Sequence, residues 1–317
     1  MAKRAKRQVL QIRPRRMSWE DAMEMYLRFR AAEGLRGATL TDYRQKIRQF
    51  FTTFPDSWPN CMEEPLLEWL AAAKSPATYN LRLGALRLFL DWAVEKQLVP
   101  SNPVAGFRMR KKSDRIVDIP EDVMRQLLTL PDRKSYVGLR DYALFTLFLD
   151  TGIRPSECFK LVPGDFNFRM RTLTVRAEVS KTGQPRGLPL SDVTIRALEE
   201  FLAVRPTEWT GSDVVFTSVY GRPLTKDTWG DIMEKYSNRL GTKVIPYDLR
   251  HMFALMFLRR GGNAFALQRI MGHESMEMTR RYVNLVQSDL KAMHRAASPV
   301  DGLVPPKRQK FDTRLRR

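Results

Sequence analysis

The chain has 317 residues, with 54 Lys and Arg against 35 Asp and Glu, and a formal net charge of +19. This length predicts about two domains, and 43% hydrophobic with 10% aromatic residues excludes a wholly disordered chain. Two cysteines cannot build a disulfide framework, no apolar segment follows the basic N-terminus, and no uninterrupted apolar run approaches the length of a membrane span, so we expect an intracellular protein.

The N-terminal part of the chain predicts a basic tail followed by a helical domain. Residues 1–16 carry seven basic and no acidic residues. Over residues 17–100, apolar residues recur with helical spacing, and Ser18 and Ser75 stand where helix caps are expected. The expected helices cover residues 18–33, 40–51, 66–73 and 75–94. We therefore expect a small all-helical domain over residues 17–100.

A linker is predicted over residues 101–117. Pro and Gly residues stop the helical pattern, and the basic run 108–115 follows. Together with the tails 1–16 and 301–317, this run holds +15 of the net charge. Basic segments that flank compact domains favour phosphate contacts with nucleic acid, although solvated tails that only aid solubility are the alternative. Charge alone does not separate DNA from RNA.

The second half, residues 118–298, predicts a mostly helical domain with a small antiparallel sheet. Helical patterns cover residues 121–130 and 142–149, and helix returns from Asp248 onward, with breaks at Gly261-Gly262 and at Gly272. Strand-like runs at 171–175 and 187–190 are joined by a hairpin-like connection that contains Gly and Pro. Val214–Phe216 is a further short apolar run. The helix after Tyr282 is expected to continue to Ala297, before a basic C-terminal tail over 299–317.

Three motifs in this half resemble those of a known family. They are Thr151–Glu157 (TGIRPSE), Tyr247–His251 (YDLRH) and Met271–Glu274 (MGHE), with Tyr282 nine residues after His273. Their order and residues resemble the tyrosine recombinase (phage integrase) family over residues 17–290. The resemblance implies a helical core-binding domain, which binds DNA, followed by a tyrosine-recombinase catalytic domain.

The resemblance also implies the catalytic residues. Tyr282 would be the nucleophile that forms a 3′-phosphotyrosine, and Arg154 and Arg250 would bind the phosphate, which their planar forks suit. Lys181, in the hairpin, would protonate the leaving 5′ oxygen, and His273 would hydrogen-bond the phosphate. Glu157 would orient the site from behind these groups. Breaking a phosphodiester without a metal needs such a set of nucleophile, cations and acid/base groups.

Each of these residues has a structural alternative. Arg176 and Arg186 lie close to Lys181 in the sequence, and hairpin alignments can slip. His273 could be a helix-end histidine with a structural partner. Tyr220 and Tyr236 are other tyrosines near Tyr282 in the sequence, but neither follows a Gly-His element.

The chain departs from the family at Tyr247, where the family usually has His. A phenol, with an ordinary pKa of about 10, is a poorer proton shuttle at neutral pH than imidazole. Tyr247 could still donate a hydrogen bond to a phosphoryl oxygen. His251 lies one helical turn further on and is a second candidate for a catalytic or phosphate contact. The general base is therefore left open, and slow recombination is one consequence.

In the helical N-terminal domain, six polar residues are expected on faces that meet the DNA major groove in the family. Asn and Arg can read adenine and guanine edges, whereas Lys suits phosphate. A solvated helix face is the alternative. The candidates are Arg44, Lys46, Arg48, Asn80, Arg82 and Arg87.

The sequence therefore predicts an enzyme, a site-specific DNA recombinase or integrase that cleaves and rejoins double-stranded DNA without metal or cofactor. We expect it to be DNA-associated, in the cytoplasm or nucleoid if the source is prokaryotic, and to act as a homo-oligomer, a tetramer on DNA. Two alternatives stay open. One is a type I topoisomerase or resolvase that acts on one duplex. The other is a catalytically weakened DNA-binding regulator, which the departure at Tyr247 keeps in view.

Overall fold

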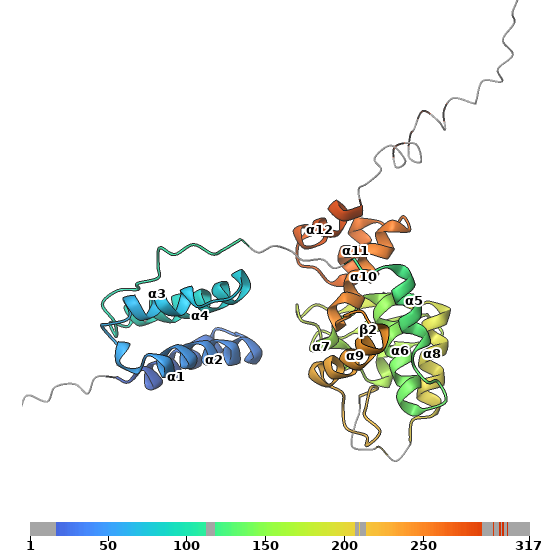
Figure 1. Ribbon diagram of the computed structural model, residues 1–317, viewed down its shortest axis with the longest axis horizontal. Helices are drawn as coiled ribbons and strands as arrows, with labels where there is room; N and C mark the ends of the chain where they lie inside the picture. Colours follow the sequence, from blue (N-terminus) through green and yellow to red (C-terminus); the bar gives the residue numbers. More distant parts are fainter. Residues whose placement is uncertain are drawn as a thin grey trace, which may run out of the picture. The chain divides into compact units, whose positions relative to one another are not determined.

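The computed structural model describes residues 17–111, 118–206, 209, 214–286, 294, 298, 300 and 303. The chain divides into two compact units, Met1–Ser113 and Asp114–Arg317 (Figure 1). The predicted basic N-terminal tail, most of the C-terminal tail and most of the helix expected beyond Val286 lie outside the described residues. The same holds for residues 112–117 of the predicted linker.

The first unit consists of helices in its described part. Ser18 accepts a hydrogen bond from the Asp21 amide (3.1 Å) and Ser75 accepts one from the Thr78 amide (3.1 Å), so both expected caps are present. The helices are α1 (Trp19–Ala32), α2 (Gly37–Thr53), α3 (Glu63–Ala71) and α4 (Pro76–Glu95), with a 3-10 turn η1 (Pro55–Ser57) between α2 and α3.

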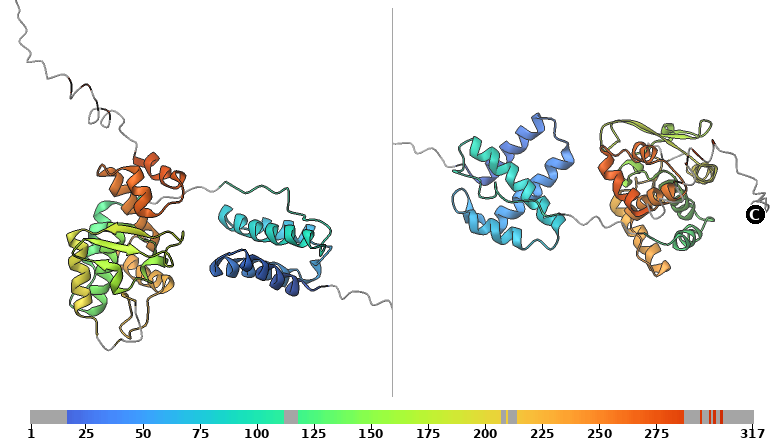
Figure 2. Two further views of the ribbon diagram at one scale, coloured as in Figure 1. Left: turned by 180° about the vertical axis from the view of Figure 1, so that it is seen from behind. Right: turned by 90° about the horizontal axis from the view of Figure 1, so that it is seen from above.

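Aromatic side chains fill the core of this unit. Phe50, Phe51 and Phe89 are fully buried, and the Trp58 ring stacks on Phe89 at 5.8 Å between centroids. Helix α2 packs against both α1 and α4 (Figure 2). This packing places the rings of Phe51 and Phe89 at 6.1 Å between centroids. Rings of this size supply much of the apolar area that a four-helix unit can bury.

The second unit is mostly helical. Its helices are α5 (Glu121–Thr129), α6 (Tyr136–Thr151), α7 (Pro155–Cys158), α8 (Asp192–Ala203), α9 (Lys226–Leu240), α10 (Pro246–Arg259), α11 (Ala264–Met271) and α12 (Met276–Val286), with a 3-10 turn η2 (Pro163–Asp165). Helices α8 and α9 were not expected from the sequence. None of the described helices in either unit combines the length and the apolar character needed to span a bilayer.

A three-stranded antiparallel sheet lies in this unit in the order β1-β2-β3, so the predicted fold class is confirmed. The strands are β1 (Phe166–Asn167), β2 (Thr172–Val175) and β3 (Arg186–Pro189). Leu173 of β2 lies opposite Phe166 of β1 and Leu188 of β3. The strand-like runs 171–175 and 187–190 were thus placed to within one residue. The apolar run Val214–Phe216 is not a strand, but Val215 and Phe216 are buried in the core.

Helix α6 is the centre of the second unit. Leu144, Phe145, Leu147 and Phe148 are fully buried, and α6 packs against α8 and α10. Helix α10 in turn packs against α11 and α12. The C-terminal end of α6 therefore comes close to the three C-terminal helices, and the sequence motifs lie where these elements meet.

Candidate active site

The TGIRPSE motif forms a tight corner between α6 and α7. Gly152 ends α6 with a left-handed backbone (φ +58°), and Arg154 caps α7, with Pro155 at its first position. An added Cβ at residue 152 would overlap the Phe253 ring of α10, so this position requires glycine. The corner buries Ile153 and aims the Arg154 side chain toward α11.

The two predicted phosphate-binding arginines meet on one turn. Arg154 Nη2 donates to the Gly272 carbonyl (2.7 Å), and Arg250 Nη2 donates to the Met271 carbonyl (2.8 Å). Arg250 Nη1 also donates to the Gly152 carbonyl. Burial, followed by the charge of Arg154, lowers the pKa of Arg250 to about 9. The guanidinium therefore stays protonated at neutral pH, and two cations share one small region.

Glu157 holds this cationic region together. Its carboxylate is fully buried and pairs with Arg154 (3.1 Å) and Arg186 (2.5 Å), and it also accepts the Lys181 amide (3.1 Å). Burial alone would raise its pKa, but the hydrogen bond and charge of Arg186, with those of its other partners, lower it instead. Glu157 therefore stays ionised and connects α7 to the β2–β3 hairpin.

Lys181 lies in the connection between β2 and β3, as predicted from the hairpin pattern, and its side chain is exposed. Beside it, a groove of about 650 Å³ is lined by Thr182, Arg186 and His273, among others. The hairpin that carries Lys181 and the predicted phosphate-contacting histidine thus border the same groove of the second unit.

Tyr282 lies among the predicted groups. Its hydroxyl is 2.7 Å from His251 Nδ1, and its ring is nearly parallel to that of His273, at 6.3 Å between centroids. His273 Nδ1 bonds the Thr279 hydroxyl (2.8 Å). Burial, then the charges of Arg250 and Arg154, lower the pKa of His273 to about 3. His273 therefore stays neutral at pH 7.

The other tyrosines have different environments. Tyr247, in the first turn of α10, is 48% exposed, and its ring centroid lies 6.4 Å from that of His251. Tyr236 donates to Asp141 (3.0 Å) within the core, and burial raises its pKa. Tyr220 is 83% exposed in a turn. Of these three, Tyr247 is the one whose ring lies beside His251, the hydrogen-bond partner of Tyr282.

Three candidate DNA-binding residues on α4 have intramolecular partners. Arg82 donates to the Trp69 carbonyl (2.5 Å) and its guanidinium lies 4.6 Å above the Trp69 ring. Arg87 donates to the carbonyls of Val104 and Phe107. These contacts stabilise the first unit, and they favour a structural role for both arginines.

Asn80 exchanges two hydrogen bonds of 2.8 Å with the Arg110 backbone. On α2, Arg44 pairs with Glu24 of α1, whereas Arg48 is exposed and Lys46 is half-buried. A DNA role for the six candidates stays a prediction, and Arg48 is the one most open to solvent contact.

Three residues near the cluster were not predicted. Arg186 pairs with Glu157 and donates to the Ile270 carbonyl (3.0 Å), Thr279 binds His273, and Arg281 lies 3.5 Å from the Tyr282 hydroxyl. The sequence signal available for Arg186 was its position directly before the short predicted strand that follows the hairpin connection with Lys181. Thr279 and Arg281 carry no such signal in the sequence.

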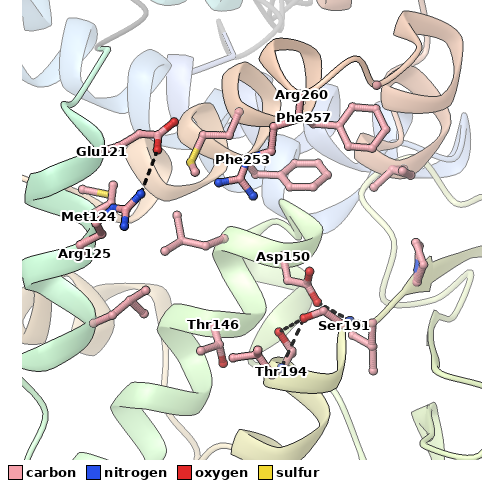
Figure 3. Close-up of a pocket in the computed structure, with 18 residues that line it drawn as sticks. Glu121, Met124, Arg125, Thr146, Asp150, Ser191, Thr194, Phe253, Phe257 and Arg260 are labelled. Carbon is pink, nitrogen blue, oxygen red and sulfur yellow. Dashed lines mark hydrogen bonds and ion pairs between the residues drawn. The ribbon is translucent and has the colours of Figure 1, made fainter.

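A different groove, of about 770 Å³, lies between α5, α6 and α10 (Figure 3). Met124, Phe253 and Phe257 give it an apolar lining, with Asp150 and Ser191 at its polar side. It includes none of the predicted catalytic residues. The described residues hold no group of three or more His, Cys, Asp or Glu side chains that could bind a metal ion.

Comparison with known proteins identifies the family. The model of the phage integrase family matches residues 118–288, which contain all the predicted catalytic residues. The chain belongs to the phage integrase family. It is 26% identical over 282 residues to tyrosine recombinase XerD of Shewanella oneidensis, which covers 85% of this chain and 93% of the relative. It is 28% identical to tyrosine recombinase XerC of Herpetosiphon aurantiacus, covering 84% of this chain and 91% of the relative. The resemblance to tyrosine recombinases is thus confirmed.

Solved structures of this family share the fold. The Tn1549 transposon integrase, in complex with a circular intermediate DNA, matches with a TM-score of 0.68 and 20% identity over 84% of this chain and 95% of that one. A lambda integrase dimer bound to a core site matches with a TM-score of 0.66 and 20% identity, over 83% and 97%. These matches include both units of this tyrosine recombinase.

Proposed function

We propose that this tyrosine recombinase binds double-stranded DNA and cleaves and rejoins it at specific sites through a 3′-phosphotyrosine on Tyr282. One observation carries the proposal. A phenol, two buried guanidinium groups and a buried histidine from four separate elements meet in one region of a family member. Placing several cations close together inside a protein is unfavourable unless anions neutralise them. A bound phosphodiester supplies such an anion and is stabilised by the same cations.

The chemistry follows from the position of each group. The Tyr282 oxygen attacks phosphorus, and Arg154 and Arg250 neutralise the non-bridging oxygens as negative charge builds up. Each guanidinium has five N–H donors, so donors remain after the carbonyl contacts are made. Lys181 protonates the departing 5′ oxygen, and His273 donates to the phosphate. Glu157 acts on Arg154 and on the hairpin, and does not touch DNA.

The buried nucleophile makes cleavage depend on DNA binding. Tyr282 is 1% exposed, with its hydroxyl bound to His251. A duplex is too bulky to approach a covered phenol, so α12 or its neighbours must shift before phosphorus reaches the oxygen. Such coupling would keep the free protein from attacking phosphodiesters at random.

We also propose that the protein acts as a homo-oligomer, a tetramer on DNA, since strand exchange requires more than one cleavage. A lambda integrase tetramer bound to a Holliday junction matches this chain with a TM-score of 0.64 and 20% identity, over 82% of this chain and 78% of that one. The net charge of +19 favours binding of each protomer to the duplex phosphates.

A nicked suicide duplex tests the proposal. After cleavage, a short strand diffuses away and traps the covalent complex, which is separated by denaturing electrophoresis. We expect the wild type to form the adduct and Tyr282→Phe to form none, with equal DNA binding by both. An adduct in both proteins, or in neither, would overturn the assignment. Relaxation of a supercoiled plasmid without a specific site would instead favour a topoisomerase.

A further inference from the structure

We propose that His251 is the general base for the nucleophile: it takes the Tyr282 phenolic proton at Nδ1 as the bond to phosphorus forms. The inference rests on the proposed role of Tyr282. It assigns the one step that the sequence left open, because Tyr247 stands where the family usually has histidine and His251 was only a second candidate for a catalytic or phosphate contact.

The geometry carries this assignment. His251 Nδ1 lies 2.7 Å from the Tyr282 oxygen, which is within the range for proton transfer along a hydrogen bond. Arg281 approaches the same oxygen at 3.5 Å, but a guanidinium cannot accept a proton. His273 lies beside the ring of Tyr282, and its Nδ1 bonds the Thr279 hydroxyl instead. Among the contacts given for Tyr282 within the described ranges, His251 is therefore the acceptor placed for the phenol.

The charges around His251 favour its neutral form before DNA binds. Arg281 and Tyr282 face it from α12, and Arg250 and Tyr247 lie near it on its own helix. Burial, then the charges of Arg281 and Arg250, lower the pKa of His251 to about 4. A neutral imidazole with its proton on Nε2 leaves the Nδ1 lone pair to accept the phenol proton.

An incoming phosphate changes this balance. Its negative charge offsets the nearby arginines, so the proton affinity of His251 rises when the reaction begins. The phenolic proton moves to Nδ1, the Tyr282 oxygen bonds phosphorus, and the bond from phosphorus to the 5′ oxygen breaks. The leaving oxygen takes its proton from Lys181. Religation reverses both transfers, and His251 returns the proton to Tyr282.

His251→Asn is the informative variant. An Asn side-chain atom can occupy the position of Nδ1 and keep a hydrogen bond to Tyr282, but an amide cannot take the proton. We expect the single-turnover rate of adduct formation on the suicide duplex to fall about 100-fold or more, in the range usual for loss of a general base. DNA binding and the melting temperature serve as controls. A rate within threefold of the wild type would overturn the proposal, since His251 would then only position Tyr282.

Rescue separates a base from a structural contact. Placing 3,5-difluorotyrosine at position 282 lowers the phenol pKa and so reduces the need for a base. We expect it to speed His251→Asn cleavage at least tenfold at pH 7, with little effect in the wild-type background, and the His251→Asn rate to rise with pH. Failure of the fluorinated residue to speed His251→Asn would also overturn the proposal.

A substrate with sulfur at the 5′ bridging position distinguishes the two ends of the reaction. Thiolate leaves without a proton, so this substrate should restore cleavage by Lys181→Ala and leave His251→Asn slow. Restoration of both variants would contradict a role of His251 at the nucleophile. Absence of any adduct with the wild type would instead defeat the proposed function itself.

Discussion

Replacing Glu157 by Gln tests how far one buried carboxylate holds the candidate site together. Glu157 is fully buried, contacts Arg154 at 3.1 Å and Arg186 at 2.5 Å, and accepts the Lys181 amide. Gln has nearly the same shape but no charge, and its NH2 group would face donors. Removing one partner of a buried ion pair typically costs about 3–5 kcal/mol, because the other charge is left unpaired. We expect a loss of that size in the free energy of unfolding.

Urea unfolding at pH 7, read by hydrogen exchange of peptides from α7 and β3, measures this change in the second unit separately from the first. The matched control is Glu200→Gln on α8, whose carboxylate pairs with Arg133 at 2.5 Å with both side chains about half exposed. An exposed pair contributes less than about 1 kcal/mol. The reasoning would be refuted if Glu157→Gln and Glu200→Gln destabilised the protein equally. DNA cleavage by Glu157→Gln should also fall about 10²-fold, as for a shift of about 1 Å in a catalytic group.

Three further predictions concern Gly152, His273 and two arginines of the first unit. Gly152→Ala should destabilise the second unit by about 2–5 kcal/mol in urea, since it combines a left-handed backbone with overlap on Phe253; an unchanged midpoint would contradict this. Burial and nearby arginines lower the pKa of His273 in the folded protein to about 3. As pH falls below 6.5, the unfolded chain therefore binds a proton at this ring before the folded protein does. His273 alone should therefore contribute a loss of about 3 kcal/mol in stability between pH 6.5 and 4, so the wild type should lose about that much more over this range than His273→Asn. Arg82→Gln should lower the stability of the first unit by about 1–2 kcal/mol and keep the salt dependence of DNA binding, whereas Arg48→Gln should reduce the salt slope by about one and keep stability. Binding titrations at several salt concentrations separate these two arginines.

The turns at the sequence motifs could be predicted because the residue types at those positions determine the local backbone conformation. Gly152 and Gly272 each end a helix in the left-handed conformation, and each stands directly before or near a predicted site residue. Such glycines show where the chain turns, and the order of the motifs shows which turns belong together. The hairpin around Lys181 could be predicted for the same reason, since Gly and Pro separate two short strand-like runs.

Contacts between distant segments could not be predicted in this way. Arg186 reaches Glu157 and the Ile270 carbonyl across 29 and 84 residues of sequence, and no local pattern encodes that meeting. The pairing of His251 with Tyr282 joins α10 to α12 in the same manner. The partner of a long polar side chain depends on tertiary packing, which sequence spacing does not specify.

The arginines of α4 illustrate a second limit. Arg82 and Arg87 occupy partly exposed positions of α4, which are as compatible with DNA as with solvent. Their long side chains instead reach backbone carbonyls outside α4, those of Trp69 and Phe107, and the guanidinium groups donate hydrogen bonds to them. Helical periodicity predicts which face a residue occupies, but not which group its charged end contacts.

Mapping the covalent link tests the central claim most directly. The wild-type protein is trapped on a suicide duplex, digested with trypsin and nuclease, and the nucleotide-bearing peptide is sequenced by mass spectrometry. The account predicts a single modified residue, Tyr282, esterified to the 3′ phosphate, and a free 5′ hydroxyl on the released strand. A phosphate ester on Tyr247, Tyr236 or any other side chain, or a link to a 5′ phosphate, would contradict it.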